Sequence, residues 1–148
     1  MSMVIHQPSS DLLPFIEFFW YVNLKVPYQL ERILPTGRLE LIINFGDSFR
    51  LYDRANPERF TLQTESWLVG LQSEYLLNEP LGQTHMMGVR FRPGGFYAFH
   101  KLPAHELHNQ IVPLESLWGS FATQVRECLL TERSLEARFA LLERLLRS

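Results

Sequence analysis

The strongest constraint on the fold is a change in hydrophobic period along the chain. Up to about Pro93, short runs alternate apolar and polar residues and are separated by turn residues. After about Pro113, apolar residues follow the spacing of amphipathic helices. No stretch between the strands has the length of a βαβ crossover, which argues against a parallel sheet. We therefore expect an α+β chain, mainly an antiparallel β-barrel or sandwich followed by C-terminal helices.

About seven or eight short strands are expected, at roughly ten-residue spacing. The clearest covers residues 17–26, with Trp20 on its apolar face and Tyr21 on the opposite face. A second covers residues 39–45, and residues 48–52 are predicted to be the return strand of its hairpin. The other predicted strands cover residues 60–64, 67–71, 74–78 and 85–92.

The C-terminal part is predicted to contain a short turn and two helices. Gly119 interrupts the helical pattern that begins at Leu114, so a new helix is expected there, capped by Ser120. Thr131 is the predicted N-cap of a last helix that ends near Leu146. The barrel part would cover residues from about 15 to about 95, and the helical part residues from about 96 to about 147 of one domain.

The last helix carries a seam of apolar residues at the spacing of a coiled coil. These residues are Leu135, Phe139, Leu142 and Leu146. Two alternatives follow from the seam. The helix packs on the barrel of its own chain, or it joins two copies in a homodimer, with these four residues at the contact.

Charge and cysteine content narrow the function classes. The chain has 14 Lys and Arg against 16 Asp and Glu, a net charge of -2, whereas a free-standing nucleic-acid binder usually has a basic excess. We therefore expect no direct DNA contact.

The single cysteine, Cys128, allows no intramolecular disulfide and is expected to be an inert thiol in the core. No signal peptide or membrane span is evident, so a cytoplasmic location is expected.

The candidate ligand-pocket residues are Trp20, Tyr21, Glu40 and Arg90. Glu40 stands alone as an acid within a strongly apolar strand, and either Arg38 or Arg90 is a candidate partner for its carboxylate. The alternative is that this face of the strand is simply solvated. The strands that carry Trp20 and Glu40 each have two faces. Either face of each strand is a candidate to line a cavity.

Features of an enzyme are weak. No nucleophile elbow, phosphate-binding loop or dinucleotide fingerprint is present, so no catalytic residue and no cofactor is predicted. His105 and His108 lie three residues apart in a turn that follows Pro103, but they form no pattern typical of a metal site, and no metal is expected. The string from Arg90 to Phe96 (RFRPGGF) is predicted to be a corner between strand and helix. Alternatively, its two glycines would let backbone N–H groups cradle an anion.

Four strings together resemble the N-terminal domain of AraC-type transcriptional regulators. They cover residues 8–21 (PSSDLLPFIEFFWY), 35–47 (PTGRLELIINFGD), 88–96 (GVRFRPGGF) and 102–119 (LPAHELHNQIVPLESLWG). The resemblance implies a cupin-like β-barrel followed by helices, in a domain that senses a small effector or mediates dimerisation. In that family a separate domain with two helix-turn-helix units binds DNA, and this chain stops where such a domain would begin. We expect an excised regulatory domain rather than a stand-alone relative.

Two other functions stay open. One is a stand-alone cupin-type protein that binds a small molecule or, with histidine ligands, a catalytic metal. The other is a constitutive dimerisation module with a fully packed barrel and no ligand. The effector, the target DNA and the direction of regulation are not predicted, because a fold alone does not supply them.

Overall fold

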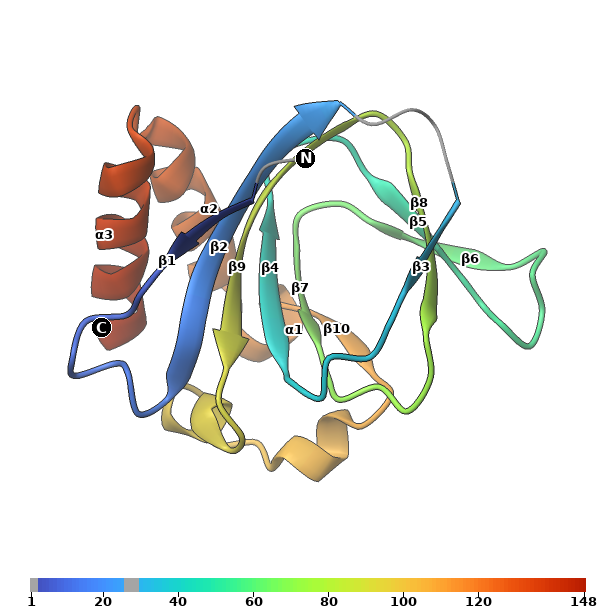
Figure 1. Cartoon of the computed structure of the whole chain (residues 1–148), viewed down its shortest axis with the longest axis horizontal. Helices are drawn as coiled ribbons and strands as arrows, with labels where there is room; N and C mark the ends of the chain where they lie inside the picture. Colours follow the sequence, from blue (N-terminus) through green and yellow to red (C-terminus); the bar gives the residue numbers. More distant parts are fainter. Residues whose placement is uncertain (1–2, 26–29) are drawn as a thin grey trace.

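The computed structural model describes residues 3–25 and 30–148, with the backbone alone for Ala104. Two antiparallel sheets face each other, and helices cover the outer side of the larger sheet (Figure 1). The larger sheet has the strand order β1-β2-β9-β4-β7-β10, and the smaller has the order β3-β8-β5-β6. The strands are β1 (Met3–His6), β2 (Ile16–Lys25), β3 (Glu31–Ile33), β4 (Glu40–Asn44), β5 (Phe49–Tyr52), β6 (Phe60–Gln63), β7 (Ser66–Val69), β8 (Leu76–Pro80), β9 (Gln83–Phe91) and β10 (Ile111–Pro113).

The helical elements follow β9 in the chain. Two short 3-10 helices, η1 (Gly95–Ala98) and η2 (Ala104–Leu107), precede β10. The α-helices come last, as α1 (Glu115–Trp118), α2 (Ser120–Thr131) and α3 (Leu135–Arg147). The expected α+β class with mainly antiparallel sheets and C-terminal helices is confirmed.

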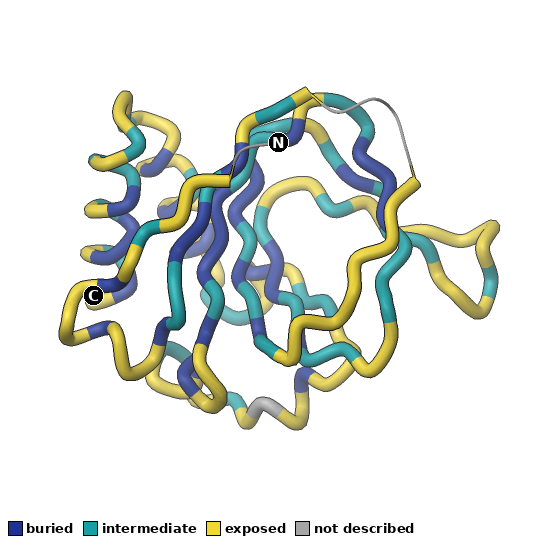
Figure 2. Tube along the Cα trace, in the orientation of Figure 1, coloured by how far each residue is buried: buried dark blue, intermediate teal, exposed yellow. Residues whose placement is uncertain are grey.

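The main core lies between the larger sheet and the helices. Residues at alternate positions of β2, β4 and β9 point to this side, among them Phe19, Leu41 and Val89, and none of the three is exposed. Leu129 of α2 and Leu142 of α3 meet them from the helices and are also fully buried. Figure 2 shows the buried stretches gathered along the central strands of the larger sheet and the inner sides of α2 and α3. The smaller sheet is more exposed.

One predicted strand pairing is wrong. β5 does not return along β4 but pairs with β6 and β8 in the smaller sheet. After β4 the chain bends toward β9, because the backbone N–H groups of Phe45 and Gly46 both donate to the carbonyl of His85. The side-chain amide of Asn44 donates to the carbonyls of Asp47 and Thr64, at 3.1 and 2.9 Å. These bonds carry the chain across to the other sheet, which a local hydrophobic pattern does not reveal.

Two predicted helix caps are also wrong. Gly119, at a φ of 59°, precedes α2 as its N-cap, and no side chain among the described residues caps this helix, although Ser120 was expected to do so. Ser134 caps α3 instead of Thr131, because its hydroxyl oxygen accepts from the backbone N–H of Ala137 at 3.1 Å. The Thr131 hydroxyl donates to the carbonyl of Cys128 at 2.7 Å, within α2.

Three short strands were not predicted, and the end of one predicted strand is outside the described residues. β1, β3 and β10 have three or four residues each, and their sequences do not alternate apolar and polar residues. Val26, the last residue of the first predicted strand, lies outside the described part of the chain.

Cys128 is exposed, so its predicted place in the core is wrong. In the described residues, no helix is both long and apolar enough to cross a membrane.

Candidate functional site

A cavity of about 270 Å³ lies between the two sheets, on the side of the larger sheet that faces away from the helices. Alternate side chains of β2 line it, including Phe18, Trp20 and Val22. Because side chains on a strand alternate between two faces, β2 gives one face to this cavity and the other to the helical core. The smaller sheet closes the opposite side with Phe49 of β5 and with residues of β3 and β8.

The indole of Trp20 has its place in the cavity wall because the residue opposite is a glycine. Trp20 pairs with Gly88 across β2 and β9. A Cβ atom on Gly88 would overlap the Cε2 and Cζ2 atoms of the Trp20 ring. Trp20 is 7% exposed, so its ring is almost entirely enclosed. The sequence contains a signal for this contact. Gly88 falls between Met86 and Arg90 in the alternating pattern of β9, so it lies on the same face of the strand as these two cavity-lining residues.

An ion pair lies in the wall of the cavity. Glu40 of β4 and Arg90 of β9 are directly opposite each other in the ladder. The Nε–H of Arg90 donates to Oε1 of Glu40 at 3.0 Å, and the two side chains are 26% and 17% exposed, respectively. The Arg90 guanidinium carbon also lies 4.8 Å from the centre of the Phe18 ring. Arg38, the other candidate partner, pairs instead with Glu17 at 3.1 Å.

The polar groups are few in comparison with the apolar wall. Asn78 of β8 and Thr84 of β9 line the cavity and are 7% exposed each. They add an amide and a hydroxyl to the carboxylate and guanidinium of the ion pair, and Glu31 of β3 contributes a second carboxylate. An apolar enclosure with a small number of directed polar groups is the usual composition of a small-molecule site. The arrangement suits a molecule with an apolar body and at least one polar or charged group.

Tyr21 does not face this cavity. It lies on the helix side of β2, where its hydroxyl is 2.7 Å from Nε2 of His85. Arg138 of α3 approaches both residues, with NH1 at 3.5 Å from the Tyr21 hydroxyl and 3.4 Å from the His85 nitrogen. Burial and, to a smaller extent, the charge of Arg138 lower the pKa of His85 below its ordinary value. The structure therefore brings Trp20, Glu40 and Arg90 together and separates Tyr21 from them.

Three of the four residues predicted for a helix seam are buried in the core of this chain. Phe139, Leu142 and Leu146 are 3%, 0% and 8% exposed, and Leu135 packs half-buried beside them. Phe139 stacks on the ring of His6 at 4.7 Å between ring centres. The seam thus packs on the larger sheet of its own chain, which is the first of the two alternatives.

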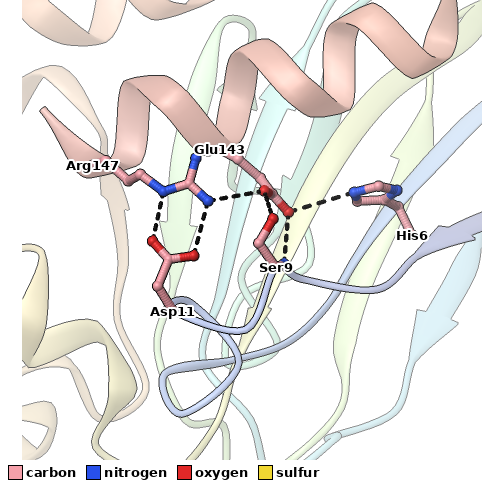
Figure 3. A network of polar contacts seen from close by, with 5 residues as sticks. All are labelled: His6, Ser9, Asp11, Glu143 and Arg147. Carbon is pink, nitrogen blue, oxygen red and sulfur yellow. Dashed lines mark hydrogen bonds and ion pairs between the residues drawn. The ribbon is translucent and has the colours of Figure 1, made fainter.

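A polar network fastens the N-terminal segment to α3 (Figure 3). Glu143, 5% exposed, accepts from the backbone N–H of Ser9 at 3.0 Å and from the Ser9 hydroxyl. Nε2 of His6 lies 3.4 Å from the same carboxylate. Arg147 donates to Glu143 at 3.3 Å and makes two bonds to Asp11, at 2.7 and 2.9 Å. The sequence gives no signal for this network, because its halves lie at opposite ends of the chain.

The N-terminal strand also reaches the inter-sheet cavity. Met3, at the beginning of β1, is one of the lining residues. His6, at the end of the same strand, contacts Glu143 and Phe139 of α3. One short segment therefore touches both the cavity and the last helix.

The histidines do not assemble with acidic residues into a metal centre in the described structure. Over residues 3–25 and 30–148, no group of three or more His, Cys, Asp or Glu side chains is placed to hold a metal ion. His105 and His108, singled out by their spacing, are both exposed, with His105 within η2 and His108 directly after it.

Comparison with known proteins gives a family but no activity. No curated protein matches this chain. The family model described as "Domain of unknown function (DUF6597)" matches residues 4–113. The matched region spans both sheets, including β2, β4 and β9 around the cavity, and ends before α1. Because the match covers well over half of the sequence, this chain belongs to the DUF6597 family.

Proposed function

We propose that this chain is the small-molecule-sensing domain of a cytoplasmic transcription regulator of the AraC type. The observation that carries the proposal is the inter-sheet cavity, with Trp20, Glu40 and Arg90 in its wall. The cavity, of about 270 Å³, is open to solvent on one side, so a small molecule can reach the aromatic and charged groups that line it. The four strings that resemble AraC-type regulators supply the regulatory context, and a closed cupin-like barrel belongs to the same proposal.

The effector is a molecule with an apolar body and a charged or hydrogen-bonding group. Arg90 uses its Nε–H for Glu40, and its terminal NH₂ groups are the donors that would bind an acceptor on the effector. The apolar body contacts Trp20, Phe18 and Phe49, which supply flat surfaces with little conformational freedom to lose. The carboxylate of Glu40 would receive a donor group if the effector carries one.

Regulation would proceed by a shift of populations. β2 and β9 contact the effector with one face and the helices with the other, so an effector that fits one arrangement of the strands favours the matching arrangement of α2 and α3. The N-terminal segment adds a second connection, from Met3 at the cavity to Glu143 in α3. A separate helix-turn-helix domain would read this change and contact DNA, while this chain makes no direct DNA contact.

A homodimer is part of the proposal, with a contact outside the predicted seam. Phe139, Leu142 and Leu146 already pack in the core of this chain. A dimer with these residues at its contact would require α3 to detach from the larger sheet. The oligomeric state is therefore measured on the intact chain rather than with a seam variant.

The experiment is native mass spectrometry of the purified chain, beside its denatured mass, after incubation with an extract of small metabolites. We expect a non-covalent organic adduct that is lost on denaturation, on a species of twice the subunit mass. In a Met86→Trp variant, which fills the cavity from β9, the adduct is expected to disappear. Leu130→Trp adds the same side chain at an exposed position of α2 and is the matched control.

Other outcomes distinguish the alternatives. If Met86→Trp removes none of the adducts that the unmodified chain carries, every ligand lies outside the inter-sheet cavity and the proposal is contradicted. A transition metal as the only adduct would favour the cupin-type enzyme. A bare dimer after incubation with the whole extract would favour the dimerisation module without a ligand.

A further inference from the structure

A second cavity lies outside the inter-sheet site, at the end of the molecule where η1 follows β9. Its volume is about 130 Å³. The segment just before β4, the residue Leu71 after β7 and the corner between β9 and η1 surround it (lower edge of Figure 1). Neither Trp20 nor any other lining residue of the inter-sheet cavity belongs to it.

The floor of this second cavity is apolar. Leu39 and Phe96 are 6% and 4% exposed, and Leu71 and Leu102 are half-buried at the sides. No polar side chain other than Arg38, Arg92 and Tyr97 contributes to the described lining. An engineered apolar cavity of about 150 Å³ accommodates benzene, so this volume is close to that of one aromatic ring.

The mouth of the cavity is positively charged. Arg92 is exposed, and its Nε–H is held by the carbonyl of Leu13 at 2.7 Å. Within the described residues no carboxylate forms an ion pair with Arg92, whereas Arg38 is paired with Glu17 at 3.1 Å. A further cation, Lys101, lies with Nζ 4.7 Å from the centre of the Tyr97 ring.

Two glycines lie at the rim of the cavity. Gly37 and Gly94 have φ values of 72° and 75°, and a Cβ on either would meet no atom within 4 Å. The Arg-Pro-Gly-Gly segment therefore turns the chain at the rim, where Gly94 adopts the positive φ that glycine tolerates best. An apolar floor of ring size beneath Arg92, which has no carboxylate partner in the described part of the chain, is complementary to an aromatic ring that bears one negative charge.

We propose that this cavity binds a small aromatic monocarboxylate, with its ring on Leu39 and Phe96 and its carboxylate at the guanidinium of Arg92. The planar guanidinium offers paired N–H donors that match the two oxygens of a carboxylate. The contact is independent of the inter-sheet cavity and of the regulatory function proposed for it. It assigns a ligand to the segment from Arg92 to Gly95, which follows β9 and contributes no residue to the inter-sheet site.

The test is titration of the ¹⁵N-labelled chain with benzoate, followed by amide NMR. Binding is expected to shift the amide signals of Gly37, Gly94 and Tyr97 and to leave those of Trp20 and Gly88 in place. Benzyl alcohol and benzylamine, which have the same ring without the negative charge, are expected to bind at least about tenfold more weakly.

The variant Arg92→Gln is expected to weaken benzoate binding about tenfold and to leave benzyl alcohol unaffected. Arg133→Gln removes the same charge at an exposed site between α2 and α3 and is expected to leave benzoate affinity unchanged. Equal affinity for benzoate and benzyl alcohol would overturn the role of Arg92. Shifts confined to Trp20 and Gly88, or no shifts at all, would overturn the second site.

Discussion

Gly88→Ala tests the packing that shapes the inter-sheet cavity, because two physical effects predict opposite signs. Gly88 has an extended backbone within β9, where replacing glycine by alanine normally stabilises a protein by about 0.5–1 kcal/mol. Here the added Cβ would overlap the ring of Trp20. Overpacking of this kind costs about 1–3 kcal/mol. The net expectation is a loss of up to about 2.5 kcal/mol, or a melting temperature lower by up to about 10 °C.

Urea unfolding followed by circular dichroism measures this loss. A double-mutant cycle with Trp20→Leu provides the control, because the smaller side chain leaves room for the new methyl group. In the Trp20→Leu background, Gly88→Ala is expected to be neutral or stabilising. If Gly88→Ala stabilises the chain that retains Trp20, the indole does not lie over Gly88 and the described cavity wall is incorrect.

Four further predictions concern groups on the helix side of the larger sheet. Glu143→Gln is expected to lower the free energy of unfolding by about 1–3 kcal/mol in urea, because a buried network loses its charge. Asp11→Asn, at the exposed end of the network, should have a much smaller effect. Equal losses for the two variants would contradict this expectation. Because the pKa of His85 lies below 6.5, the unfolded chain takes up its proton first and stability falls as the pH decreases through this value. Arg138→Gln should raise the NMR titration midpoint of His85, and an unchanged midpoint would show that Arg138 exerts no influence. Cys128 should react with a thiol reagent in the native state at its unfolded rate, and strong protection would refute its exposure.

The long strands could be predicted because their pattern is local. β2 and β9, with ten and nine residues, are long enough to show alternation of apolar and polar positions. β1 and β3 form because a neighbouring strand offers free hydrogen-bonding groups, and nothing in their own short sequences requires this. The pairing of β5 was wrong for a related reason. It depends on hydrogen bonds of Asn44 and Phe45 to distant residues, which a hairpin pattern does not contain.

The candidate site was predicted only in part, because alternation within a strand is visible in the sequence and the packing of distant elements is not. The inward register of Glu40 and Arg90 follows from alternation, and their pairing follows from the alignment of β4 with β9. Alternation also places Trp20 and Tyr21 on opposite faces of β2, so both could not line one cavity. Which face meets the cavity depends on where α2 and α3 pack, and this is a tertiary property. The regular spacing of Phe139 and Leu142 predicted a packed seam, but the same spacing serves the core of one chain or a dimer.

The central claim is that the cavity between the sheets binds a small molecule beside Trp20. The most direct measurement is the indole N–H signal of Trp20 in a ¹⁵N-labelled sample, recorded against a panel of small amphipathic molecules. At least one class of molecule is expected to shift this signal in a saturable manner and to leave the indole of Trp118, among the helices, unchanged. If no molecule moves the Trp20 signal, or if every binder acts on Trp118 and not on Trp20, the cavity is not the sensing site.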